Sequence, residues 1–189
     1  MRDRLGGTDG NEILTVTTAV VLTLLLIAEG VTVIWMGGLV SAHMFIGLAL
    51  IPPLLLKLSS VGYRFVRYYS GSRAYRAKGP PRLLLRVLAP ALVLTTLAVF
   101  TTGVVLMADG HKAGTLLEVH KVSFIVWGVL FGVHFLAYVP QVVRSLPDAW
   151  SRARRPAGAG LRGMLLAASA GGGVALGLAL LPTITSWRA

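Results

Sequence analysis

The sequence predicts an all-α, polytopic membrane protein with five transmembrane helices: a four-helix up-down bundle plus one additional C-terminal helix. Hydrophobic residues make up 55% of the 189 residues and charged residues 13%, whereas a soluble domain usually carries about 25% charged residues. The apolar residues are gathered into blocks of about 20, the length that crosses a hydrocarbon core as a helix. The mean hydropathy of +0.75 also favours an integral membrane protein.

Five apolar blocks are the expected spans, and they are helices because a membrane offers no water to unpaired backbone groups. They cover residues 13–36, 39–61, 87–107, 119–140 and 164–181. The predicted organisation is a loosely ordered cytoplasmic tail, a four-helix bundle, a basic cytoplasmic loop and a fifth helix with a short outer tail, at residues 1–12, 13–140, 141–163 and 164–189.

Basic residues predict how the chain is oriented. Fifteen of the 18 Lys and Arg residues lie in residues 2–4, 57–86 or 144–162, and cytoplasmic loops carry such an excess. The N-terminus and the loops after the second and fourth helices are therefore expected in the cytoplasm, and the C-terminus outside. The first apolar run is long and lacks a small-residue cleavage pattern, so we expect it to remain as a span.

The first two helices are expected to form an antiparallel hairpin, because only the pair Gly37–Gly38 separates them. Glu29 lies about two turns before the outer end of the first helix. A carboxylate inside a membrane is costly enough to suggest a function, with a hydrogen-bonded glutamate near the interface as the alternative. His43 lies near the outer start of the second helix, with Gly47 one turn further on the same face. Pro52–Pro53 should bend this helix, since each proline removes a backbone donor.

Residues 64–86 combine arginine and lysine with tyrosine. The plainest interpretation is structural, because basic residues hold a loop in the cytoplasm and tyrosines form the aromatic belt at the membrane interface. The same stretch is also a candidate for binding anionic lipid head groups or a cytoplasmic partner. Nucleic-acid binding is not expected, because nothing in the chain resembles a folded reader module.

The fourth helix carries His120 and His134, fourteen residues apart. Fourteen residues are close to four helical turns, so both rings point roughly the same way, about 21 Å apart. Gly128 and Gly132 would let a helix or a flat macrocycle approach closely. The fifth helix is rich in glycine and is expected to pack against other helices, including those of a second copy in a homo-oligomer. His111, in the outer loop, is expected to be solvated.

Two histidines of different helices are expected at the same depth. The second and fourth helices run parallel and stand diagonally in an up-down bundle, where such bundles build cofactor sites. His43 and His120 both lie near the outer face, which is the arrangement of bis-histidine haem b. Lys112 or Lys121 would neutralise the haem propionates. Glu29 would accept a hydrogen bond from one outer histidine, since an axial histidine usually donates from its other ring nitrogen.

With these histidines the chain resembles the small bacterial membrane-embedded b-type cytochromes of the four-helix, di-haem type. In that family a histidine followed by x-x-x-Gly precedes a second histidine by about four turns, and the pattern recurs on the partner helix. The stretch His43–Met44–Phe45–Ile46–Gly47 matches the first half-motif. His120 and His134 match the partner pair, with Phe124 in place of its glycine. The resemblance covers residues 11–140 and implies the cytoplasmic membrane of a bacterium.

One position departs from the family pattern. Lys57 stands fourteen residues after His43, where the family has its fourth histidine. The inner haem is then absent, or it is bound by His134 alone, or Lys57 is an unusual second ligand after losing its proton. Because Lys57 can extend its ammonium group to the basic interface, we expect one haem b, bound by His43 and His120.

The expected function is the transfer of single electrons by a membrane cytochrome, which exchanges them with a redox partner protein or a quinone at the outer face. Two histidine ligands leave no open position on the iron, which favours electron transfer over oxygen activation. The absence of cysteine excludes disulfides and covalent c-type haem. No hydrolase or phosphate-binding motif indicates a self-contained enzyme.

Two other classes of function are compatible with the residues. A non-redox scaffold or assembly subunit would dock a partner or anionic lipid through residues 64–86, and its histidines would be interhelical hydrogen-bond partners. A metal or proton transporter would use the intramembrane histidines and Glu29 as a relay, but the chain shows no inverted repeat.

Overall fold

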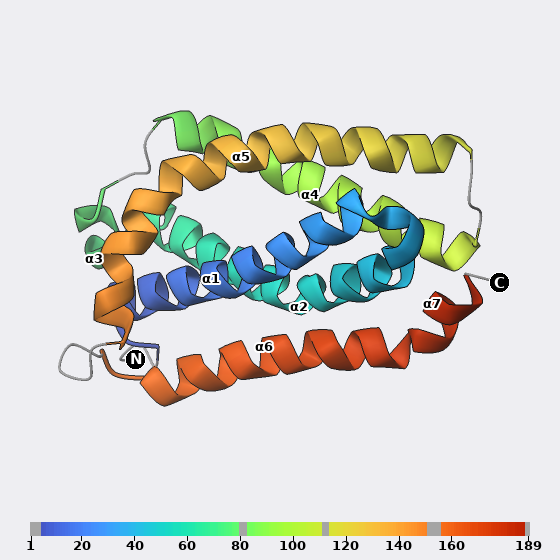
Figure 1. The fold of residues 1–189 in the computed structure, drawn as a ribbon. Coiled ribbons are helices and arrows are strands. Elements are labelled where there is room, and N and C mark those ends of the chain that lie inside the picture. The colour runs from blue at the N-terminus through green and yellow to red at the C-terminus, as the bar shows by residue number, and fades with distance from the viewer. Residues whose placement is uncertain (1–4, 80–82, 111–113, 151–155, 188–189) are drawn as a thin grey trace. The chain divides into compact units, whose positions relative to one another are not determined.

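A computed structural model describes residues 5–79, 83–110, 114–150 and 156–187 (Figure 1). All regular elements in this part of the chain are helices: α1 (Gly7–Ile34), α2 (Met36–Tyr69), α3 (Arg73–Ala77), α4 (Leu83–Asp109), α5 (Thr115–Trp150), α6 (Ala159–Ala179) and α7 (Leu181–Ser186). Five of them, α1, α2, α4, α5 and α6, are long and apolar enough to cross a membrane. The predicted fold class is confirmed: the chain is an all-α polytopic membrane protein.

The helices fall into two compact units. The first unit contains α1, α2, α3 and α6, and the second contains α4, α7 and the part of α5 up to Pro140. The fifth predicted span, α6, thus belongs with the first two. The predicted four-helix bundle would combine the first two spans, in one unit, with the next two, in the other unit. This bundle therefore stays a prediction.

The hairpin of the first unit reverses at Trp35. α1 ends at Ile34 and α2 begins at Met36, and the carbonyl of Trp35 accepts hydrogen bonds from the N–H groups of Gly38 and Leu39 at 3.1 and 3.2 Å. Leu39 has non-helical angles, φ −117° and ψ 16°. The reversal therefore lies just before the glycine pair at which we expected it.

The glycines of α6 pack on the proline-containing part of α2. The backbone of α2 keeps helical angles through Pro52 and Pro53, and its one departure is at Leu39. Proline has no N–H, so Pro53 leaves the carbonyl of Ala49, four residues earlier, without its usual helical donor. A Cβ atom added to Gly173 would lie 2.3 Å from this carbonyl oxygen. Only glycine lets α6 come so close to α2.

This packing occupies one face of α2 and leaves the histidine on the other. Phe45, Ala49 and Pro52 share a face by their i, i+4, i+7 spacing, while His43 and Gly47 lie on the opposite face. A Cβ atom added to Gly177 would lie 2.6 Å from the ring of Phe45. The glycine face of α6 is therefore used within the chain; a homo-oligomer would form through another surface and stays a prediction.

At the other end of the first unit, α1 begins at Gly7, six residues before the expected start at Ile13. Arg162 is buried and donates to the carbonyl oxygens of Leu5, Ala157 and Pro156 at 2.6, 2.7 and 3.1 Å. These bonds tie the start of α1 to the start of α6. Residues 7–12 are thus helical rather than a loose tail.

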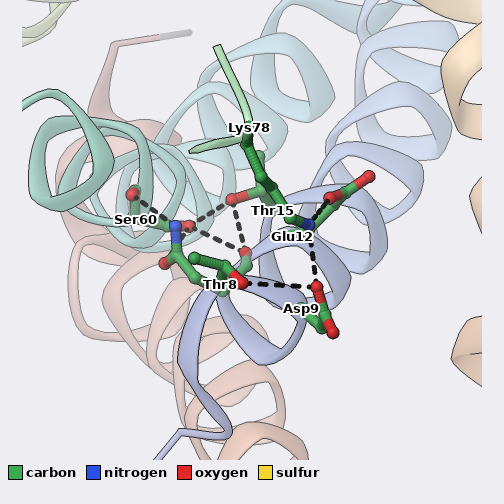
Figure 2. Close-up of polar contacts among 7 residues, drawn as sticks. Thr8, Asp9, Glu12, Thr15, Ser60 and Lys78 are labelled. Carbon is green, nitrogen blue, oxygen red and sulfur yellow. Dashed lines mark hydrogen bonds and ion pairs between the residues drawn. The ribbon is translucent and has the colours of Figure 1, made fainter. Parts of the chain in front are cut away.

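Polar side chains join α1 to α2 and to the segment after α3 near this end (Figure 2). Asn11 is buried, donates to the carbonyl of Ser60 at 3.2 Å, and accepts from its hydroxyl at 3.2 Å. The hydroxyls of Thr15 and Ser60 also contact each other. Lys78 forms ion pairs with Asp9 at 2.8 Å and Glu12 at 2.6 Å.

In the second unit, long side chains bridge α4 and α5. Trp127 donates from its indole nitrogen to the hydroxyl of Thr96 at 3.0 Å. After α7, Trp187 donates to the carbonyl of Leu106 at 3.2 Å. α5 continues to Trp150, ten residues beyond Pro140, where we expected a loop to begin.

Candidate functional site

His43 is held between α1 and α2 by two side chains of α1. Its Nδ1 atom lies 3.0 Å from Oε1 of Glu29 and 3.1 Å from the hydroxyl oxygen of Thr32. The side chains of His43 and Glu29 are 22% and 13% exposed. A Cβ atom added to Gly47 would lie 3.5 Å from Oε1 of Glu29, so a small residue one turn after His43 leaves room for the carboxylate.

The hydrogen bonds around Thr32 identify the tautomer of His43. A hydroxyl has one hydrogen, and the shortest contact of Thr32 is to the carbonyl oxygen of Glu29, at 2.6 Å. The hydroxyl oxygen therefore accepts from His43, as does the Glu29 carboxylate. Nδ1 of His43 then carries a hydrogen, and in the neutral imidazole Nε2 is the nitrogen with the lone pair.

His120 has the same arrangement in the second unit. Its Nδ1 atom lies 2.9 Å from the hydroxyl oxygen of Thr102 on α4. Thr102 donates its own hydrogen to the carbonyl of Ala98 at 2.7 Å, so Nδ1 of His120 is also the donor. A Cβ atom added to Gly103 would lie 3.1 Å from Cε1 of His120, so glycine gives the imidazole its place beside α4.

Each unit thus orients one histidine through a threonine of the preceding helix. The sequence singled out both histidines and predicted that Glu29 would accept a hydrogen bond from one of them. In the structure Glu29 lies beside His43. We did not predict Thr32 or Thr102. Thr32 stands three residues after Glu29, on the same face of α1, which was the signal available for it. Thr102 was visible only as one of several threonines in its helix.

His120 and His134 lie on one stripe of ring side chains along α5. The residues at i, i+4, i+7, i+11, i+14 and i+18 are His120, Phe124, Trp127, Phe131, His134 and Tyr138. The rings of Trp127 and Phe131 stack, with centroids 4.8 Å apart and planes 10° from parallel. The ring of His134 lies 4.7 Å from that of Tyr138. The stripe predicted from the two histidines is therefore continuous between them.

Gly128 and Gly132 lie beside this stripe. Among the described residues of the second unit, nothing outside α5 comes within 4 Å of a Cβ atom added to either glycine. Within the second unit, the predicted close approach of another helix to this pair is therefore not made by the described residues, and the approach of a macrocycle stays a prediction.

Lys57, fourteen residues after His43, is hydrogen-bonded to the backbone of α1. Its Nζ atom donates to the carbonyl of Thr15 at 2.8 Å. The Nζ atom is therefore held between α1 and α2, near the Asn11–Ser60 pair.

Of the two predicted propionate partners, the structure describes Lys121, near the start of α5. Lys121 is exposed and pairs with Glu118 at 2.9 Å. Lys112 and His111 lie outside the described residues. Among the described residues no group of three or more His, Asp or Glu side chains could hold a metal ion. The predicted haem site has only two protein ligands, so this finding does not test it. Because His43 and His120 belong to different units, their pairing stays a prediction.

Comparisons with known proteins identify no relative. No family model matches the chain, and neither a curated protein nor a solved structure matches it. The resemblance to four-helix b-type cytochromes therefore depends on the histidine motifs of the sequence.

Proposed function

We propose that this chain is a b-type cytochrome of a bacterial cytoplasmic membrane, which carries single electrons through one haem bound by His43 and His120. The observation that supports it most is the repeated Thr–His hydrogen bond. An axial histidine usually donates from one ring nitrogen to an acceptor and binds the metal with the other. His43 and His120, one in each unit, both donate from Nδ1, so Nε2 is the nitrogen that would bind iron.

The residues around each histidine suit this role. Glu29 gives His43 a carboxylate acceptor, which makes the imidazole a stronger donor of electron density to a metal. Thr102 gives His120 a neutral acceptor. Bound haem would supply reversible one-electron chemistry, and two histidine ligands would leave no open position for oxygen. The residues of the chain then fix the orientation of the two ligands.

The same proposal includes one haem rather than two. Lys57 donates to the carbonyl of Thr15, so its side chain is already engaged by the backbone of α1 rather than by an iron. His134 would then lack a matching ligand in the inner half of the membrane. With the N-terminus in the cytoplasm and the C-terminus outside, the haem lies near the outer face, where a redox partner protein or quinone would exchange electrons. Lys112 and Lys121 are the candidates to neutralise the propionates.

The difference spectrum of the purified protein tests the proposal. Detergent-solubilised protein is reduced with dithionite and compared with its oxidised form, and a sharp α-band of haem b is expected. His43→Ala and His120→Ala should each abolish the band, while His111→Ala should retain it. A band that persists in either of the first two variants would exclude that histidine as a ligand. Loss of a second redox step in His134→Ala would contradict the single haem.

The scaffold function is the second candidate, and the arginines at the inner end of α2 favour it. A colourless preparation without bound iron would exclude the cytochrome and leave a docking role for residues 64–86. The spectrum therefore separates the two candidates in one measurement.

A further inference from the structure

The inner end of α2 extends beyond the length that a membrane core requires. The 34 residues of α2 span about 51 Å, whereas a hydrocarbon core is about 30 Å thick. His43 lies close to the outer end in the proposed orientation. The last turns of α2, from Val61 to Tyr69, then lie at the cytoplasmic head groups, followed by the short helix α3.

Four arginines on this segment have no carboxylate partner in the described part of the chain. Arg64, Arg67, Arg73 and Arg76 form none of its ion pairs; Arg67 donates to the hydroxyl of Ser72 at 3.4 Å. The nearby acidic residues of α1 are already engaged, because Lys78 pairs with both Asp9 and Glu12 (Figure 2). The segment therefore keeps a surplus of positive charge.

Exposed apolar side chains lie between these arginines. Phe65 and Val66 are each 61% exposed, and Tyr69 is 56% exposed. The rings of Phe65 and Tyr69 lie 4.5 Å apart. Together with the four arginines they form what we call the arginine–aromatic surface. Aromatic side chains of this kind favour the membrane–water interface, where the ring meets lipid and the polar groups meet water.

The fold holds this surface in place. α3 returns against α2 through Tyr75, which is buried and meets the ring of Tyr63 edge-on at 5.9 Å. The ion pairs of Lys78 then attach the end of α3 to α1. The arginines of α2 and α3 are thus on neighbouring, connected elements rather than on a free loop.

We propose that the arginine–aromatic surface binds the head-group phosphate of anionic phospholipids in the cytoplasmic leaflet. The planar guanidinium donates two parallel hydrogen bonds to phosphate oxygens, and the flanking Phe65, Val66 and Tyr69 lie against the acyl boundary. A lipid fits better than a soluble acidic protein, because the charges alternate with exposed rings on a helix that leaves the membrane. The proposal rests on the proposed orientation of the chain and is independent of haem.

Lipid selectivity in reconstituted bilayers tests this proposal. The protein is placed in phosphatidylcholine vesicles containing spin-labelled phosphatidylglycerol or spin-labelled phosphatidylcholine, and electron paramagnetic resonance gives the immobilised fraction of each. Basic residues near a charged surface attract anionic lipid strongly enough to expect about fivefold selectivity for phosphatidylglycerol. A wild-type selectivity close to one would refute the proposal and favour an acidic protein as the occupant.

Matched variants separate this surface from general positive charge. Arg64→Gln/Arg67→Gln should reduce the selectivity at least twofold, whereas Arg86→Gln/Arg144→Gln removes the same charge elsewhere and should change it little. Equal losses in the two double variants would overturn the assignment. Arg64→Lys/Arg67→Lys keeps the charge but removes the paired guanidinium bonds, so its selectivity should lie between those of the wild type and the glutamine variant. A selectivity equal to that of the wild type would overturn the guanidinium assignment, and a complete loss would show that the charge of this surface does not attract the lipid. The haem spectrum is not a readout, so this proposal and the cytochrome proposal can fail separately.

Discussion

Replacing Gly173 by alanine should force α6 away from α2. The added Cβ atom would lie 2.3 Å from the carbonyl oxygen of Ala49 and 3.1 Å from its Cα atom. Both neighbours are backbone, so no side chain can rotate to make room, and one helix has to move. Adding a methyl group to a well-packed contact typically costs about 1–3 kcal/mol.

The neighbouring Gly172 provides the control. A Cβ atom added there would lie 3.9 Å from Cβ of Pro52, which is an ordinary contact. Both substitutions gain the same intrinsic helix preference of alanine over glycine, about 1 kcal/mol. The difference in stability between Gly172→Ala and Gly173→Ala therefore isolates the steric cost, which we expect to be about 1–3 kcal/mol.

Thermal unfolding in detergent, followed by circular dichroism at 222 nm, measures this difference. Gly172→Ala should unfold at or above the wild-type temperature and Gly173→Ala several degrees below it. Equal unfolding temperatures for the two variants would show that α6 does not pack on the Ala49 carbonyl, and the assignment of α6 to the first unit would be wrong.

Three further predictions concern polar contacts within single units. Thr102→Val removes the acceptor of His120 and should raise the haem midpoint potential by about 20–60 mV, the equivalent of one hydrogen bond; a redox titration showing no shift would contradict the assigned tautomer. Asn11→Ala removes two side-chain hydrogen bonds to Ser60 and should cost about 1–3 kcal/mol in thermal unfolding, whereas an unchanged midpoint would show that the Asn11–Ser60 pair adds nothing. Burial alone would lower the pKa of Lys78, but its hydrogen bonds to Asp9 and Glu12 and their charges outweigh this effect and raise the pKa above 10.5. Because a raised pKa stabilises the fold below the unfolded-state value, Lys78→Met should cost up to about 1 kcal/mol at pH 7–9 for this partly exposed group. That cost should disappear as the pH rises through the raised pKa, and a cost independent of pH would refute the ion-pair interpretation.

The spans could be predicted from the sequence, whereas their ends could not. An apolar block of about 20 residues has one stable form in a membrane, so hydrophobicity alone predicts each helix. The helices continue into polar sequence where specific partners exist. α1 begins at Gly7 because Arg162 donates to the carbonyl of Leu5 and Asn11 pairs with Ser60. Those partners are 49 residues or more away in the chain, so no local pattern reveals them.

The helix against which α6 packs could not be predicted for a similar reason. Its glycines predicted close approach to some helix, but not to which one. The choice of α2 depends on the carbonyl of Ala49, which Pro53 leaves without a donor, and on the ring of Phe45 against Gly177. From the sequence, the prolines of α2 predicted a bend in this helix. In the structure, Pro53 instead leaves one carbonyl of α2 without a helical donor, and a glycine of α6 lies close to that carbonyl.

The histidines could be predicted because their spacing and depth follow from helix geometry, but their orientation depends on neighbours. Thr32 and Thr102 each give their hydrogen to a carbonyl of their own helix. That bond, usually a minor feature of a membrane helix, leaves the hydroxyl oxygen as an acceptor only. The imidazole beside it must then donate from Nδ1, so a backbone bond in one helix determines which nitrogen of the next helix has a lone pair. The same sequence of bonds occurs in both units, with a carboxylate added at His43 alone. If both nitrogens bind one iron, the two ligands differ in basicity, and the charge of Glu29 makes His43 the stronger donor.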